Sequence, residues 1–158
     1  MELEAAVSES WAAFAAVQDA AFATATAATR ASFPPASRLT AAELRDVLTG
    51  ARHLVVATTR PDGRPHSTPS SFACYDGGFW LPAGAGTVRV RNVRTTPYAA
   101  IVVMADAIVT AEGPATLTSD PPAGVLTAYD RSVDWVSTWI VVRPERLFSY
   151  RGTDRGGD

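Results

Sequence analysis

The chain has 158 residues and a formal net charge of −2, and all 14 of its basic residues are arginine. This length fits one ordinary domain with a short extra segment. The near-neutral charge offers no basic footprint for DNA or RNA, so we expect no nucleic-acid partner. The single cysteine, Cys74, excludes a disulfide or a cysteine-based zinc site within one chain, and we expect no metal.

Residues 2–31 are expected to form a helix, because apolar residues recur at helical spacing. The stripe consists of Leu3, Val7, Trp11, Phe14 and Phe22. Pro34 and Pro35 then break the chain. We expect this helix to dock on the same chain or on a partner subunit, because its stripe is too apolar to stay in water.

A second helix is predicted from Thr40, which forms a capping box with Glu43 and ends near Gly50. From His53 the pattern changes to strands joined by tight turns, with short helical pieces over residues 87–94 and 120–129. The expected strands cover residues 53–60, 64–75, 79–81, 98–105, 108–118, 135–142 and 146–150. This order favours a mainly β fold with accessory helices, built as a small antiparallel barrel.

The division that follows has an N-terminal helical extension over residues 1–37 and a barrel domain over residues 38–152. Residues 153–158 are expected to be a disordered tail. Glu2 and Glu4 stand where a signal peptide has basic residues, and the longest apolar runs are too short to span a bilayer. We therefore expect a cytoplasmic protein with no membrane partner.

A glycine-rich turn over residues 84–86 leads into the helical segment 87–94, and such a helix start is a natural site for an anion. Arg89 and Asn92 are three residues apart and share one helix face, while Arg91 and Arg94 share the roughly opposite face. The alternative is that all of these arginines are solvated surface residues. The local sequence alone favours that alternative.

A polar stretch runs from His66 to Ser71, and strand alternation places His66, Thr68 and Ser70 on one face. These groups are able to hydrogen-bond the polar edge of a ligand, and the alternative is a plain exposed strand. No acid–base pair or triad is identifiable, so no catalytic residue is assigned. Such a site suits a cofactor enzyme, because hydride chemistry belongs to the cofactor.

Cys74 has apolar neighbours and is predicted to be a small buried side chain rather than a nucleophile. Trp135 and Trp139 are expected on the same face of one strand. Core packing is the first interpretation for both, and a flat wall beside a cofactor ring is the alternative.

The central and C-terminal parts of the chain resemble the pyridoxamine 5′-phosphate oxidase-like, FMN-binding split-barrel superfamily, and in particular its small flavin/deazaflavin oxidoreductase branch. The matching residues keep the family's order over roughly two-thirds of the chain. They are Ala57-Thr58, Asp62-Gly63-Arg64-Pro65-His66, Pro69, Phe72, Asp76-Gly77, Gly86-Thr87, Arg89, Arg91, Asn92, Pro97 and Arg143-Pro144-Glu145-Arg146. Two departures stand out: Val88 replaces a basic residue, and the arginine-rich substrate-binding C-terminus of the true oxidases is missing.

The resemblance implies a six-stranded antiparallel split β-barrel and a homodimer with a cofactor groove shared between subunits. It favours FMN or coenzyme F420 as cofactor, and an oxidoreductase that transfers hydride between this cofactor and a small organic acceptor. A non-catalytic carrier of flavin or haem is the alternative, and a structural dimer without ligand is a third interpretation. The expected cofactor-binding residues are Arg89, Asn92, Thr87, Gly86, His66, Thr68 and Ser70.

Overall fold

The computed structural model describes residues 2–152 and the side chains of residues 10–152. The side chains of Leu3 and Val7 and the predicted tail over residues 153–158 lie outside the described part. The helices are α1 (Glu2–Ala23), α2 (Ala27–Ser32), the short 3₁₀ helix η1 (Pro35–Ser37), α3 (Ala41–Gly50), α4 (Val88–Thr95) and α5 (Ala123–Tyr129). The strands are β1 (His53–Thr59), β2 (Pro65–Ser71), β3 (Ala73–Tyr75), β4 (Gly78–Ala83), β5 (Tyr98–Met104), β6 (Ile108–Thr118), β7 (Thr138–Val142) and β8 (Arg146–Tyr150).

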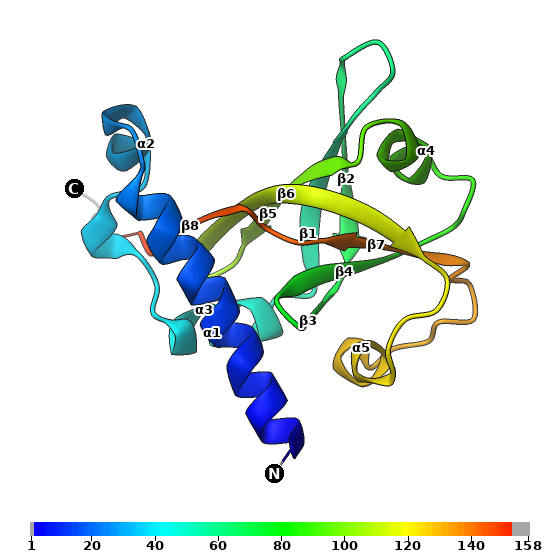
Figure 1. Ribbon diagram of the computed structural model, residues 1–158, viewed down its shortest axis with the longest axis horizontal. Coiled ribbons are helices and arrows are strands. Elements are labelled where there is room, and N and C mark those ends of the chain that lie inside the picture. Colours follow the sequence, from blue (N-terminus) through cyan, green and yellow to red (C-terminus); the bar gives the residue numbers. More distant parts are fainter. Residues whose placement is uncertain (1, 153–158) are drawn as a thin grey trace, which may run out of the picture.

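The strands form one curled antiparallel sheet in the order β2-β1-β5-β6-β7-β4-β3, and β8 pairs with β6 off this path (Figure 1). The predicted mainly β barrel with an appended N-terminal helix is therefore confirmed. The sheet has eight strands rather than six. One reason is that the expected strand over residues 64–75 divides at Phe72, where the chain leaves β1 and begins to pair with β4.

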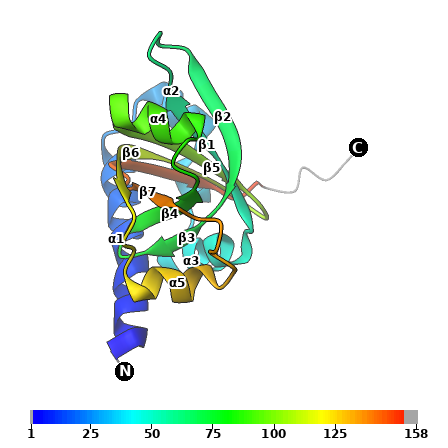
Figure 2. The same cartoon turned by 90° about the vertical axis from the view of Figure 1, so that its right-hand side faces the viewer.

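The barrel is split between β2 and β4, and we call this boundary the seam. The sheet order begins with β2 and ends with β3, and these two strands are joined through the single residue Phe72. The chain is therefore continuous at this point, while β2 remains unpaired, within residues 2–152, on the side away from β1. Figure 2 shows α4 above this end of the sheet and α5 below it.

Strand β6 turns the corner between the two halves of the barrel. Its first part pairs with β5 and β8, and residues 115–118 pair with β7. Gly113 lies at the corner, where an added Cβ would collide with the Arg143 carbonyl oxygen. Only glycine fits there, because the turn from β7 to β8 crosses directly over this position.

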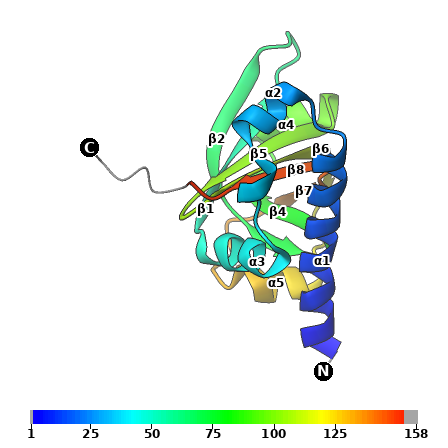
Figure 3. The ribbon, with the colours of Figure 1, turned by 90° about the vertical axis from the view of Figure 1, so that its left-hand side faces the viewer.

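Helix α1 packs on β8 and α3, which confirms that it docks on its own chain (Figure 3). Phe14 is fully buried, and the centroid of its ring lies 5.0 Å from the ring centroid of Phe79 on β4. Gln18 is also buried: it donates to the Leu39 carbonyl over 2.7 Å and accepts a hydrogen bond from the Ser149 hydroxyl. The helix therefore completes the barrel core.

The single helix expected over residues 2–31 is wrong, because α1 ends at Ala23 and α2 begins at Ala27. Thr26 caps α2 by accepting a hydrogen bond from the Thr29 amide over 3.2 Å. Arg30 folds back and donates to the Phe22 carbonyl over 2.9 Å, which satisfies one carbonyl at the end of α1. Local threonine hydrogen bonds compete here with the continuous helix.

Trp139 is buried in a small second core with Trp80 and Tyr129, as core packing requires. Placing Trp135 on the same strand is wrong, because β7 begins only at Thr138 and Trp135 is 55% exposed. The Val136 amide bonds the Val133 carbonyl and makes a turn in place of strand pairing. Cys74 is half-buried and packs against the main core. Desolvation raises the pKa of its thiol well above its usual range, as expected for a packing side chain rather than a nucleophile.

Candidate functional site

Helix α4 is set in place by the turn over residues 84–87. The Thr87 hydroxyl and amide both donate to the Gly84 carbonyl, over 2.9 and 3.1 Å, so this hydroxyl does not cap the helix. The Ala85 amide donates to the Ser137 hydroxyl over 2.7 Å and ties the turn to the segment before β7. Gly86 and Thr87 are exposed, and an added Cβ at Gly86 would meet nothing within 4 Å. The start of α4 is therefore open on this side.

Arg89 spans the seam. Its Nη2 donates to the Pro82 carbonyl on β4 over 2.7 Å, and its Nη1 donates to the Pro69 carbonyl on β2 over 3.4 Å. Its Nε is buried without a partner, and burial lowers the pKa of the guanidinium below its usual value. No carboxylate in the described part of the chain pairs with Arg89. The seam thus holds a half-buried cation with spare N–H donors and no counter-charge.

Asn92 lies on the buried face of α4, and its side-chain amide donates to the Thr58 hydroxyl over 3.0 Å. Thr58 lies on β1 directly opposite His66 on β2. Residues directly opposite in an antiparallel pair share a sheet face, so His66 faces the same side as Thr58 and Asn92. The helix and the polar strand therefore meet at this point.

The alternation predicted for β2 is present. His66, Thr68 and Ser70 lie opposite Thr58, Val56 and Leu54, which are all buried side chains of β1. Ser70 is itself buried and donates to the Ser71 carbonyl over 2.8 Å. His66 Nδ1 and Thr68 Oγ1 are buried and have no hydrogen-bond partner. The inner face of β2 therefore carries unsatisfied polar atoms beside the seam.

These orphaned atoms test whether the site fits a cofactor. Four such side-chain atoms occur in the described residues, and three belong to His66, Thr68 and Arg89. Buried polar atoms are normally satisfied, so a cluster without partners calls for an explanation. A ligand with hydrogen-bonding edges and an anionic group would satisfy all three. The residues present therefore fit a ligand that carries hydrogen-bonding groups and a negative charge.

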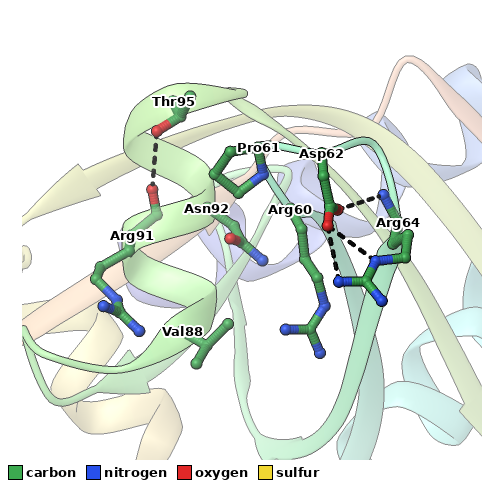
Figure 4. A pocket seen from close by; sticks show the side chains of 8 residues that line it. All are labelled: Arg60, Pro61, Asp62, Arg64, Val88, Arg91, Asn92 and Thr95. Atoms are coloured by element: carbon green, nitrogen blue, oxygen red, sulfur yellow. Dashed lines mark hydrogen bonds and ion pairs between the residues drawn. The ribbon is translucent and has the colours of Figure 1, made fainter.

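A pocket of about 430 Å³ opens between α4 and the hairpin that joins β1 to β2 (Figure 4). We call it the arginine pocket. Its lining is Arg60, Pro61, Asp62, Arg64, Val88, Arg91, Asn92 and Thr95. The residues from α4 follow the spacing i, i+3, i+4, i+7, which is one face of a helix.

The sequence interpretation missed the arginines of this pocket. Arg91, predicted on the face roughly opposite that of Arg89 and Asn92, is exposed as a solvent-facing residue should be, and it lines the pocket together with Asn92. Arg60 and Arg64 flank the tight turn at Asp62, and neither is among the predicted cofactor-binding residues. Helical spacing was the available signal for Arg91. No local pattern predicts that the hairpin tip folds over α4.

The split barrel, and the polar side chains that β1, β2 and α4 bring together at Thr58, His66 and Asn92, point to the class of protein. The family model described as pyridoxamine 5′-phosphate oxidase matches residues 40–149, and the chain belongs to this family. No curated protein matches the chain.

Several solved structures share the fold. A conserved hypothetical protein, Rv2991 from Mycobacterium tuberculosis, has a TM-score of 0.66 and 22% identity, covering 80% of this chain and 98% of that chain. A protein named F420 reductase has a TM-score of 0.54 and 22% identity, covering 65% and 94%. A pyridoxamine 5′-phosphate oxidase-related, FMN-binding protein from Nostoc punctiforme has a TM-score of 0.52 and 17% identity, covering 67% and 79%. At these identities the likeness shows the fold.

None of the described helices combines the length and apolar character needed to cross a membrane.

Proposed function

We propose that this protein binds a phosphorylated flavin or deazaflavin along the seam and acts as an oxidoreductase on a small organic acceptor. The observation that carries this proposal is the set of orphaned atoms on His66, Thr68 and Arg89. Family membership supports it, and the similar structures include proteins named for FMN binding and for F420 reduction.

Arg89 is proposed to bind the cofactor phosphate. A guanidinium carries five N–H donors, and the two carbonyl contacts leave Nε and further donors free. A half-buried cation without a counter-charge is stabilised by an anion, and charge-assisted hydrogen bonds to phosphate are short and strong. Asn92 is proposed to act by fixing α4 on Thr58.

His66 and Thr68 are proposed to hydrogen-bond the polar edge of the cofactor from the inner face of β2. Ser70 lies deeper on the same face and bonds a backbone carbonyl, so it shapes the floor. The bound group would supply the hydride chemistry. The protein's residues bind it, orient it and keep water away from its buried side.

The first test is cofactor titration. An absorbance scan of the purified protein detects bound flavin or haem, and FMN and F420 are then titrated into cofactor-free protein. Arg89→Ala should weaken affinity by roughly 1.5–3 kcal/mol, the scale of a hydrogen bond to a charged group. Arg94→Ala is the control, because Arg94 is exposed near the end of the same helix. Equal losses in both variants would contradict the phosphate assignment.

Arg89 also links the Pro69 and Pro82 carbonyls, so each variant's melting temperature is measured without cofactor. A variant that keeps its melting temperature and loses affinity has lost a ligand contact. Titration with haemin tests the haem-carrier alternative. Haemin binding with a Soret band, together with failure to bind FMN or F420, would replace the proposed function.

A further inference from the structure

The arginine pocket lies beside the proposed phosphate site and is separate from Arg89. Its α4 wall consists of Val88, Arg91, Asn92 and Thr95. Arg89 follows Val88 in the helix, does not line the pocket, and extends instead to the carbonyls of Pro69 and Pro82 at the seam. Figure 4 shows Arg60 and Arg91 extending from opposite walls, with Val88 between them in this view.

The charges in the pocket do not balance. Asp62 forms an ion pair with Arg64, whose Nη2 and Nε lie 2.8 and 2.9 Å from one oxygen of the Asp62 carboxylate. The pKa of Asp62 is lowered, first by the Arg64 side chain and then by the Arg64 amide, with a smaller effect of Arg60. Among the described residues, no carboxylate pairs with Arg60 or Arg91. Two guanidinium groups therefore share the pocket without a counter-charge.

The hairpin that carries Arg60 is rigidly built. The Gly63 amide donates to the Arg60 carbonyl, and the Arg60 amide donates to the Arg64 carbonyl, both over 2.9 Å. Asp62 also accepts the Arg64 amide over 3.1 Å. Gly63 has φ of 85°, as this tight turn requires. The guanidinium of Arg60 therefore extends from a fixed base, unlike that of a solvated arginine on a loose loop.

We propose that the arginine pocket binds a second anionic group, a carboxylate or phosphate held between Arg60 and Arg91. Planar guanidinium groups suit both oxyanions, because each offers paired N–H donors. The group has two sources: an acidic extension of the cofactor beyond its phosphate, or a separate acidic substrate. The first source rests on the proposed function and distinguishes F420, which carries carboxylates beyond its phosphate, from FMN, which does not.

The experiment compares Arg60→Gln and Arg91→Gln with the control Arg94→Gln. Inorganic pyrophosphate is titrated by calorimetry into the cofactor-free protein, and FMN and F420 are titrated separately. Pyrophosphate should bind the wild-type protein and bind each pocket variant roughly 3- to 20-fold more weakly, as expected for partly exposed charge-assisted contacts. Its affinity should fall as salt is added, and Arg94→Gln should leave it unchanged.

The cofactor arms identify the source. If F420 affinity falls in both pocket variants while FMN affinity stays within twofold, the pocket holds the cofactor's extension. If pyrophosphate still binds protein loaded with F420 and both variants lose this binding, the pocket holds a substrate. Pyrophosphate binding that ignores both substitutions, or that falls equally in Arg94→Gln, overturns the proposal. So does an equal loss of FMN affinity, since the pocket would then be the single phosphate site.

The pyrophosphate arm needs no cofactor, so it decides the pocket's role even in a protein that binds neither FMN nor F420. Failure of the proposed function and failure of this inference therefore give different results.

Discussion

Thr68 has a buried hydroxyl with no partner on the inner face of β2. An unsatisfied buried hydroxyl destabilises the ligand-free protein, and valine has nearly the same shape without the polar atom. Thr68→Val should therefore leave the stability of the ligand-free protein unchanged or raise it. The same substitution should weaken cofactor affinity by about 0.5–1.5 kcal/mol, because it removes a hydrogen bond to the ligand.

Urea unfolding without cofactor and a cofactor titration measure the two effects. Ser67→Ala is the matched control, since Ser67 is exposed on the opposite face of the same strand. Loss of stability in Thr68→Val with unchanged affinity would show that the hydroxyl is structural.

At the scale of single elements, the capping box of α3 is present as predicted. The Thr40 hydroxyl accepts the Glu43 amide over 3.2 Å, and the Glu43 carboxylate accepts the Thr40 amide over 2.8 Å. The backbone hydrogen bond from Thr40 is the first cause of a lowered Glu43 pKa. A carboxyl whose pKa is lowered on folding stabilises the fold above its unfolded pKa, and this contribution is lost as pH falls through the folded pKa.

We therefore expect Glu43→Ala to lower the melting temperature by roughly 2–4 °C at pH 7 and by less at pH 3. Melting curves across this pH range measure the difference between the two proteins. Asp46→Ala on the same helix is the control outside the capping box. A difference that is equal at both pH values would mean that the carboxylate charge has no part in the cap.

Helix α1 belongs to the core through Phe14, which contacts Trp11 and Phe79. Phe14→Ala should cost about 3–5 kcal/mol of unfolding free energy, because it leaves a cavity in a packed core. Urea unfolding measures this cost, with the exposed Ala16→Ser as control. Cofactor affinity should stay within a few-fold in Phe14→Ala and in a protein lacking residues 1–33. A truncated protein that melts normally and fails to bind cofactor would place the helix in the site.

For the molecule as a whole, we propose a homodimer through the outer face of β1 and β5. Val55 lies directly opposite Val102 on this face, and Tyr98 and Met104 lie farther along β5. Val55, Tyr98 and Met104 are 40%, 38% and 74% exposed, and such apolar patches commonly mark interfaces. Trp139, by contrast, is covered within its own chain.

Light scattering should give a dimer mass for the wild-type protein and a monomer mass for Val55→Asp, which places a charge in the interface. Ala16→Asp on α1 is the control and should remain dimeric. A wild-type monomer with tightly bound cofactor would contradict a site shared between subunits.

The sequence predicted what local chemistry determines. The Thr40 cap, the turn at Gly63 and the alternation along β2 each depend on neighbouring residues, and each is present. The helix break at Thr24–Thr26 and the late start of β7 depend on competing hydrogen bonds that the apolar pattern does not report.

The features of the site that the sequence did not predict depend on contacts between residues that are far apart in the chain. The family resemblance favours Arg89 and Asn92 as site residues, and no local pattern predicts that Arg89 bridges β2 and β4. The arginine pocket depends on how the hairpin meets α4, which involves residues about 30 positions apart. Spacing within one element does not contain that information.

The seam also leaves an open strand edge, and open edges can recruit strands of other molecules and cause aggregation. Pro65 and Pro69 lack amide hydrogens, so neither residue can donate a backbone hydrogen bond. They lie opposite Thr59 and Val55 of β1, at positions of the ladder where the backbone groups of β2 point away from β1 and toward the open edge. The Pro69 carbonyl, which would accept a foreign amide, already receives Arg89. The edge along which the cofactor is proposed to lie therefore offers few backbone N–H donors, and a guanidinium occupies one of its carbonyls. Another strand would pair poorly with this edge, whereas a small ligand could still bind there.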